Sequence, residues 1–277
     1  ACIREARKSR LPDFVTDWLD SLLTNREISA EINGFKQTRV ANKGTPQGGV
    51  WSLKLWNMAV DVLIKEAHKD AITCVGFADD MLLLMSGLDP NIILRTLQDK
   101  VQKLQELVRK LGLTYNEKKT ELVMFTLRKK IPKLKPFKMG NTIVPISAEA
   151  KYLGITLDKG LTYSSHIKQK VTATKKCIMA LNSLVRKRWG PNPKLMRLAY
   201  TSVARSKLTY GGHVWQHKKG QDAQVTRCQR LGLLTLAPTQ PSTPTLRLQA
   251  IWGIQPIDLF LQEAALKTYV RIKDKVK

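Results

Sequence analysis

Asp79 and Asp80 lie between two apolar runs in the stretch VGFADDMLLLMSG. Thr73–Phe77 and Met81–Met85 have the composition of short strands, so the pattern predicts a hairpin whose turn contains Ala78 and both acids. Because the second run lacks polar alternation, we expect it to be buried on both faces. Like charges this close disfavour joint ionisation unless a cation compensates them.

The acid pair has two explanations. Asp is common in tight turns that face water. Alternatively, the turn brings the two carboxylates together as ligands for Mg²⁺, which takes one or two protein carboxylates plus phosphate oxygens. Two such ions can clamp the attacking and leaving oxygens of a phosphoryl transfer. These residues alone leave a solvated turn and a metal site both open.

The net charge limits the partners of the chain. Its 277 residues include 47 Lys and Arg against 22 Asp and Glu, a formal net charge of +25. So large an excess repels itself, and nucleic acid is the first candidate for a partner that neutralises it. A solvated basic surface without a partner is the alternative. Basic residues lie beside apolar helical sequence at Lys168–Lys176 and Arg271–Lys277, which favours basic faces on folded elements over a floppy arm.

Cysteine usage and apolar run length bear on location. The four cysteines lie far apart without CxxC spacing, which fits a reducing compartment and therefore a nuclear or cytoplasmic location. The longest apolar run near the acid pair is too short to span a bilayer, so we expect no membrane partner.

Apolar periodicity predicts an α+β fold. Helices are expected at Leu11–Leu23 and Trp51–Ala67, and from Asp89 to Gly112. A hairpin is expected around Asn33-Gly34. Strands are expected at Leu122–Phe125 and Tyr152–Leu157, and after about residue 160 the pattern predicts helices only. This order places a domain boundary near residue 160.

Four ordered motifs carry a resemblance to a known family. They are FADD (Phe77–Asp80), GTPQGGVWSLKLWN (Gly44–Asn57), LGLTYNEKKTELVMF (Leu111–Phe125) and KYLGITLD (Lys151–Asp158). In order and spacing they resemble the reverse transcriptases of non-LTR retrotransposons, which are LINE-like elements, and in particular the jockey-like ones. The later segments LTYGGHVW and LGLLTLAPTQ resemble the region that follows the polymerase in these polyproteins.

The resemblance implies a fold and an activity. It implies a partial right-hand polymerase palm, an antiparallel sheet with helices, over residues 1–160, followed by an all-α thumb and connection region over residues 161–277. The implied activity is RNA-directed DNA polymerase, a nucleotidyl transfer to a primer 3′-hydroxyl with Mg²⁺, or Mn²⁺ in its place. The implied partners are an RNA template, a DNA primer and dNTP. An endonuclease segment is expected upstream, and a downstream RNase H segment is left open.

The same resemblance assigns roles to residues of this chain. Asp79 and Asp80 would bind the metal and act in catalysis, with Asp79 the more direct ligand, and Lys119 would stand near the departing pyrophosphate. The remaining assignments are template and nucleotide contacts at Gly44, Pro46, Gln47, Gly48, Gly49, Phe77 and Ala78, and a primer grip at Tyr152, Leu153 and Gly154. The plainer alternatives are a loop hydrogen bond for Gln47, solvated surface for Lys119 and core packing for Tyr152.

Departures from the family pattern argue against polymerase activity of the isolated chain. The pattern has a third catalytic Asp on a strand before the PQG loop, and a fingers region, and neither is recognisable here. Trp51 replaces the usual Leu, and Lys54 introduces a charge at a normally apolar position. We therefore expect the isolated chain not to extend a primer, and the alternative function is that of a catalytically inactive retrotransposon remnant that only binds nucleic acid.

Overall fold

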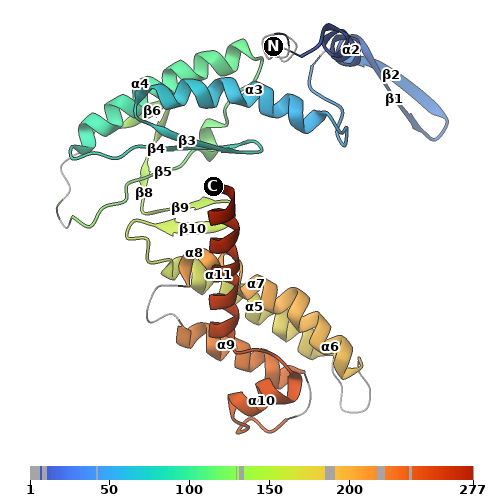
Figure 1. Cartoon of the computed structure of the whole chain (residues 1–277), viewed down its shortest axis with the longest axis vertical. Helices are drawn as coiled ribbons and strands as arrows, with labels where there is room; N and C mark the ends of the chain where they lie inside the picture. The colour runs from blue at the N-terminus through green and yellow to red at the C-terminus, as the bar shows by residue number, and fades with distance from the viewer. Residues whose placement is uncertain are drawn as a thin grey trace. The chain divides into compact units, whose positions relative to one another are not determined.

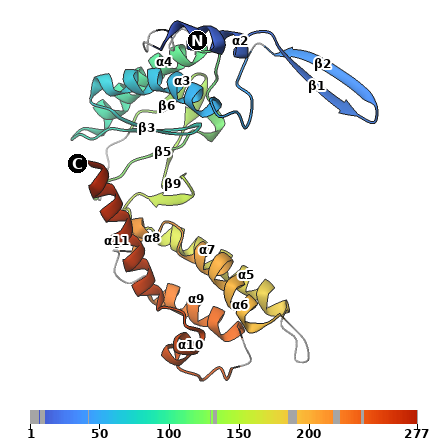
Figure 2. The same ribbon diagram turned by 45° about the vertical axis from the view of Figure 1, so that its right-hand side comes forward.

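The chain folds into two compact units. The computed structural model describes residues 7, 11–41, 43–128, 130, 134–184, 191–216, 222–236 and 239–276. The first unit comprises residues 1–120 and 130–145, and the second comprises residues 121–129 and 146–277. Both combine helices with small two-stranded sheets, in agreement with the predicted α+β class (Figure 1, Figure 2).

The described part of the first unit holds three long helices and three hairpins. Their bounds are α2 Asp13–Leu23, β1 Arg26–Ile32, β2 Phe35–Ala41, α3 Ser52–Ala67, β3 Thr73–Phe77, β4 Asp80–Leu84, α4 Pro90–Lys110, β6 Phe137–Met139 and β7 Thr142–Val144. Each hairpin is a separate antiparallel pair. Short 3₁₀ turns lie at His68–Asp70 and Glu117–Lys119.

Helix α4 begins and ends where the sequence predicts. The Asp89 carboxylate accepts a hydrogen bond from the Asn91 backbone N–H at 2.8 Å, and Pro90 occupies the first turn, where its missing N–H costs nothing. Beyond its C-terminal end Gly112 has φ +75°, which glycine adopts without steric penalty. The buried face of α4, with Leu104 and Val108, packs against α3 and β3 (Figure 1).

The second unit is mainly helical. Its elements are β5 Leu122–Val123, β8 Ile146–Ser147, β9 Glu149–Tyr152, β10 Ile155–Asp158, α5 Ser164–Leu184, α6 Pro193–Ala199, the π-helical turn η3 Tyr200–Arg205, α7 Ser206–Leu208, α8 Gly212–Trp215, α9 Asp222–Thr235, α10 Thr245–Trp252 and α11 Ile257–Val276. Strands β9 and β10 form an antiparallel hairpin, and β5 pairs with β8 in parallel.

One large core joins the helices of the second unit. Tyr200 and Trp215 are its largest fully buried side chains. The Tyr200 ring packs where Gly232 of α9 leaves room, since a Cβ there would lie 2.3 Å from the ring. Buried Gln229 of α9 accepts hydrogen bonds from Gln249 at 2.9 Å and from the Ile257 N–H at 3.2 Å, which links α9 to the following two helices.

Asp158 organises the connection from β10 to α5. Its carboxylate accepts hydrogen bonds from the backbone of Gly160, Thr162 and Tyr163 and from the Thr162 hydroxyl, at 2.6 to 3.1 Å. Burial raises the pKa of Asp158, but these hydrogen bonds outweigh burial and lower the pKa overall. The connection contains two positive φ angles, at Leu161 and Tyr163, so the carboxylate stabilises a strained backbone.

Two sequence expectations are corrected by the structure, and three short strands are added. Strand β4 is only half-buried, and Leu84 is exposed, because the hairpin is a two-stranded sheet whose other face has no covering layer among the described residues. Tyr152–Leu157 is not one strand, because Leu153-Gly154 forms a turn between β9 and β10. The strands β6 to β8 were not predicted at all.

The domain boundary predicted near residue 160 stays a prediction. In the structure β9 and β10 belong to the same compact unit as the helices that follow them. No described helix is long and apolar enough to cross a membrane. Cys74, Cys177 and Cys228 are free thiols, and Cys2 lies outside the described residues.

Asp158→Asn should destabilise the chain by about 1–3 kcal/mol, because backbone donors in a strained connection lose a charged acceptor. Urea denaturation followed by tryptophan fluorescence measures the loss.

The contribution of Asp158 to stability also depends on pH. Because its pKa is lowered in the folded chain, the stabilisation is present above the ordinary pKa of Asp and is lost as the pH falls through the folded pKa. The variant should therefore lose less stability than the wild type on acidification. Asp274→Asn, an exposed position on α11, is the matched control, and equal effects of the two variants would refute the role of Asp158.

Candidate active site

The PQG loop is a tight turn that feeds directly into α3. Gly44 and Gly48 have φ of +77° and +81°, which explains glycine at both positions. The Pro46 carbonyl accepts the Gly49 N–H at 3.2 Å and the Ser52 hydroxyl at 2.5 Å, so the loop is closed by its own backbone and by the first residue of the helix.

The side chain that the loop presents is Gln47. It is exposed and forms no hydrogen bond with a described residue, so the loop hydrogen bond that was the plainer explanation for it is not seen. Gly48 and Gly49 are exposed beside it. A backbone without Cβ atoms can be approached closely by a ligand.

The acidic turn closes the β3–β4 hairpin. Phe77 pairs with Asp80 across the two strands, so Ala78 and Asp79 form a two-residue turn. Ala78 has φ +52°, a left-handed conformation that costs a non-glycine residue about 1 kcal/mol. Asp79 and Asp80 are both exposed to solvent.

A single hydrogen bond joins the acidic turn to the PQG helix. The indole N–H of Trp56, on α3, donates to the carbonyl of Ala78 at 2.7 Å, across 22 residues of sequence. Gly76 of β3 approaches the same helix, because a Cβ there would lie 3.2 Å from Ile64. The two most specific motifs of the sequence, PQG and FADD, are thus held together in one unit.

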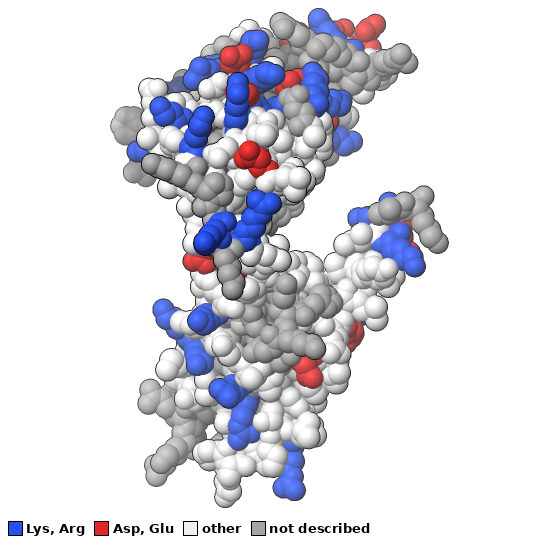
Figure 3. All heavy atoms as spheres, turned by 90° about the vertical axis from the view of Figure 1, so that its left-hand side faces the viewer, with Lys and Arg blue, Asp and Glu red and all other residues white. Residues whose placement is uncertain are grey.

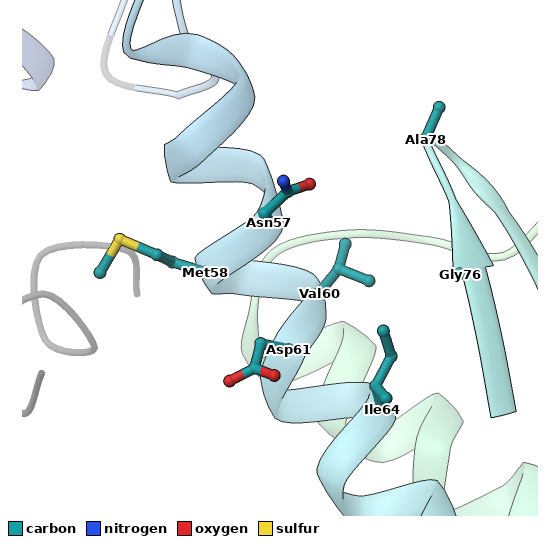
Figure 4. Close-up of a pocket in the computed structure, with 7 residues that line it drawn as sticks. All are labelled: Asn57, Met58, Val60, Asp61, Ile64, Gly76 and Ala78. Carbon is teal, nitrogen blue, oxygen red and sulfur yellow. The ribbon is translucent and has the colours of Figure 1, made fainter. Parts of the chain in front are cut away.

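An open pocket lies between α3 and the end of the hairpin. Asn57, Asp61 and Ile64 line it from the helix, and Gly76 and Ala78 line it from the hairpin (Figure 4). Its volume is about 460 Å³. Asp61 forms an ion pair with Lys65 at 2.5 Å on the helix surface.

Tyr115 ties the LGLTYN segment to the same hairpin. Its hydroxyl contacts the sulfur of Met81 at 3.4 Å. Burial, and then the nearby Cys74, raise the pKa of Tyr115 to about 12, so the phenol is protonated at neutral pH. Lys119 follows on an exposed 3₁₀ turn in this unit and forms no ion pair with Asp79 or Asp80.

The predicted primer-grip residues lie in the second unit. Leu153 and Gly154 have φ of +46° and +77° and form the turn between β9 and β10. Tyr152, the last residue of β9, is half-buried. The carbonyl of Leu153 accepts the hydroxyl of Tyr210 at 2.8 Å.

Two carboxylates fit the donor chemistry of a hard divalent cation, but they do not complete a site by themselves. Within the described ranges, no group of three or more His, Cys, Asp or Glu residues is placed to hold a metal ion. The acidic turn therefore offers part of a ligand set, and the remaining ligands would come from substrate phosphates, water or another segment.

Sequence reasoning missed the role of Trp56. A half-buried indole usually finds a partner for its N–H, but the sequence does not show which carbonyl lies within its reach. Asn57 and Asp61 were also missed, and their spacing on one side of the predicted helix is the signal that could have marked them.

Comparison with known proteins decides the lineage. A protein-family model described as "Reverse transcriptase (RNA-dependent DNA polymerase)" matches residues 3–157, more than half of the chain. The chain belongs to the reverse transcriptase family.

Curated relatives of this family member come from mobile elements, as the motifs predicted. The chain is 27% identical over 258 residues, 90% of its length, to a 115 kDa protein in the Drosophila melanogaster type-1 retrotransposable element R1DM. It is 30% identical to the probable RNA-directed DNA polymerase from transposon BS of that organism, over 71% of its length, and 23% identical to the RNA-directed DNA polymerase from mobile element jockey, over 70%. It spans 24%, 22% and 22% of these three relatives.

Trp56→Phe should destabilise this reverse transcriptase segment by about 1 kcal/mol, because the Ala78 carbonyl loses its donor. Urea denaturation measures the change, and far-UV circular dichroism checks that α3 is intact. Trp51→Phe, at the start of the same helix, keeps an aromatic ring and removes no side-chain hydrogen bond to a described residue, so it should change stability by a few tenths of a kcal/mol. A loss of stability in Trp56→Phe no larger than that in Trp51→Phe would contradict a stabilising role for the hydrogen bond between Trp56 and Ala78.

Proposed function

We propose that this chain is part of an RNA-directed DNA polymerase from a non-LTR retrotransposon, which extends a DNA primer on an RNA template with dNTP. The observation that carries the proposal is the hydrogen bond from Trp56 to Ala78, because it brings the acidic turn to the helix that follows the PQG loop. Residues 1–160 would contribute to the polymerase palm, and residues 161–277 would form a helical thumb and connection region.

The proposed roles are those that the family resemblance assigns to these residues. Asp79 and Asp80 would hold Mg²⁺, or Mn²⁺, at the exposed turn. When bound, such an ion stabilises charge that develops on the transferred phosphoryl group. Template and incoming nucleotide would meet Gly44, Pro46, Gln47, Gly48, Gly49, Phe77 and Ala78, and Lys119 would offer a cation or proton to pyrophosphate. Tyr152, Leu153 and Gly154 would grip the primer.

Charge supports nucleic-acid partners. Lys and Arg side chains are spread over the visible face, where Asp and Glu are fewer (Figure 3). Each phosphate contact by such a side chain releases counterions, so the net charge of +25 favours binding to RNA and DNA at low salt. The described free thiols fit the proposal that the protein acts in the nucleus or cytoplasm.

A second candidate function is nucleic-acid binding without catalysis. One observation favours it: among the described residues, no third acidic side chain joins Asp79 and Asp80 to complete a metal site. The loss of one carboxylate from a two-metal site costs several kcal/mol of transition-state stabilisation.

We expect this chain to bind an RNA–DNA primer–template at low salt but not to extend the primer with Mg²⁺ present. Fluorescence anisotropy measures binding, and gel analysis of a labelled primer measures extension. Extension that disappears in Asp79→Asn, while Asp99→Asn on α4 retains it, would establish catalysis and overturn the expected inactivity. Failure to bind the primer–template at low salt would contradict the proposed function itself.

A further inference from the structure

Lysines from two helices lie beside Tyr210 in the second unit. Lys170 of α5 places its Nζ 4.2 Å from the centroid of the Tyr210 ring. Lys207 of α7 donates a hydrogen bond to the sulfur of Cys177 at 3.2 Å. Cys177 follows Lys170 by two helical turns and therefore lies on the same side of α5. Both ammonium groups therefore lie along the same side of α5.

A third lysine reaches the same region from the β9–β10 hairpin. Lys151 of β9 pairs with Thr156 of β10. Thr156 in turn contacts α5 twice, through its N–H to His166 at 3.2 Å and through its hydroxyl to Gln169 at 3.3 Å. Lys151 is therefore carried on the strand pair that packs against the first turns of α5. Burial, and then the charges of Lys151 and Lys207, lower the pKa of Lys170.

Carboxylates do not neutralise this lysine cluster, which we define as Lys151, Lys170 and Lys207. None of the three forms an ion pair with a described residue. Asp158 is engaged by its own backbone donors, and Glu121 accepts the N–H of Lys151 at 2.9 Å rather than its ammonium group. Like charges held together in this way repel one another until an anion binds between them.

Tyr210 gives the cluster a rigid base. Its hydroxyl donates to the Leu153 carbonyl, and its own carbonyl accepts the Trp215 indole N–H at 3.0 Å. His166 is fully buried, and its Nδ1 accepts the Thr156 N–H, so the hydrogen of the neutral ring is on Nε2 and points to the Tyr210 carbonyl at 3.3 Å. A Cβ on Gly154 would lie 3.1 Å from the Tyr210 ring, so the ring would have to shift, and the φ of +77° at this position also favours glycine.

We propose that Lys151, Lys170 and Lys207 form a phosphodiester-binding site beside the Leu153–Gly154 turn, where they take the backbone of a nucleic-acid strand. The choice of ligand rests on the proposed function. Lys170 and Lys207 lie beyond residues 3–157, the part that the family model matches, so the helical region completes a site that begins on a family motif. Ammonium groups on flexible stems bind phosphates without reading sequence.

The test is the salt dependence of binding to a labelled RNA–DNA primer–template, measured by anisotropy. In the Lys170→Gln/Lys207→Gln double variant the affinity should fall severalfold, and the slope of log affinity against log salt should become shallower by about two. The Lys168→Gln/Lys176→Gln double variant is the matched control. It removes the same charge from exposed positions of α5 that lie about 120–160° around the helix from Lys170.

Further measurements separate the outcomes. Lys170→Arg keeps the charge and should bind like the wild type, and thermal melting should show all variants folded. Equal slope changes in the two double variants would overturn the proposal, because the cluster would then act as ordinary basic surface. If the wild type itself fails to bind, the proposed function fails instead, so the two failures are distinguishable. Inorganic phosphate that competes as well as an unlabelled oligonucleotide of equal phosphate concentration would also contradict a strand-binding site.

Discussion

The hydrogen bond between the Trp56 indole and the Ala78 carbonyl is the constraint on which the candidate active site depends. A two-residue turn leaves its carbonyl groups outside the strand ladder, and an indole N–H in a half-buried position needs an acceptor. The bond satisfies both groups at 2.7 Å. It also fixes the end of the hairpin against α3, and the contact of Gly76 with Ile64 holds the strand behind it. The acids can therefore project into solvent from a turn whose backbone is anchored.

The second unit depends on buried or half-buried polar groups that serve as junctions. Asp158 orders the entry to α5, His166 joins that helix to β10 and to Tyr210, and Gln229 joins α9 to the helices after it. Such junctions specify one arrangement because each lost partner leaves a buried polar group unsatisfied. Burial, followed by the charges of nearby lysines, lowers the pKa of His166, so this junction stays neutral at physiological pH.

Local signals in the sequence predicted the elements well wherever chemistry fixes an end. Asp89-Pro90 marked the start of α4, and Asn33-Gly34 marked the first hairpin, where both residues have positive φ. Prediction failed where the position of a turn or strand depends on residues that are distant in the sequence. The Leu153-Gly154 turn is stabilised by Tyr210, 57 residues later, and β5 pairs with β8 across a long connection. The apolar run of β4 predicted full burial, but burial depends on how many layers surround a strand, which a local pattern does not specify.

The residues of the candidate site could be named from the sequence, but their assembly could not. The family resemblance names Asp79, Asp80 and the PQG residues, because they stand in two of its motifs. The contact between the two motifs could not be predicted, since it requires the α3–β3 packing. The roles assigned to these residues, to Lys119 and to Tyr152, Leu153 and Gly154 all remain proposals.

The proposal on which the candidate active site rests is that the acidic turn holds a divalent cation. Manganese-induced line broadening of backbone amide signals in the isotopically labelled chain measures this most directly. The amides of Gly76 to Met81 should broaden first, and this broadening should be lost in the Asp79→Asn/Asp80→Asn double variant. Broadening that begins elsewhere in the chain, or that persists at the turn in the double variant, would contradict it.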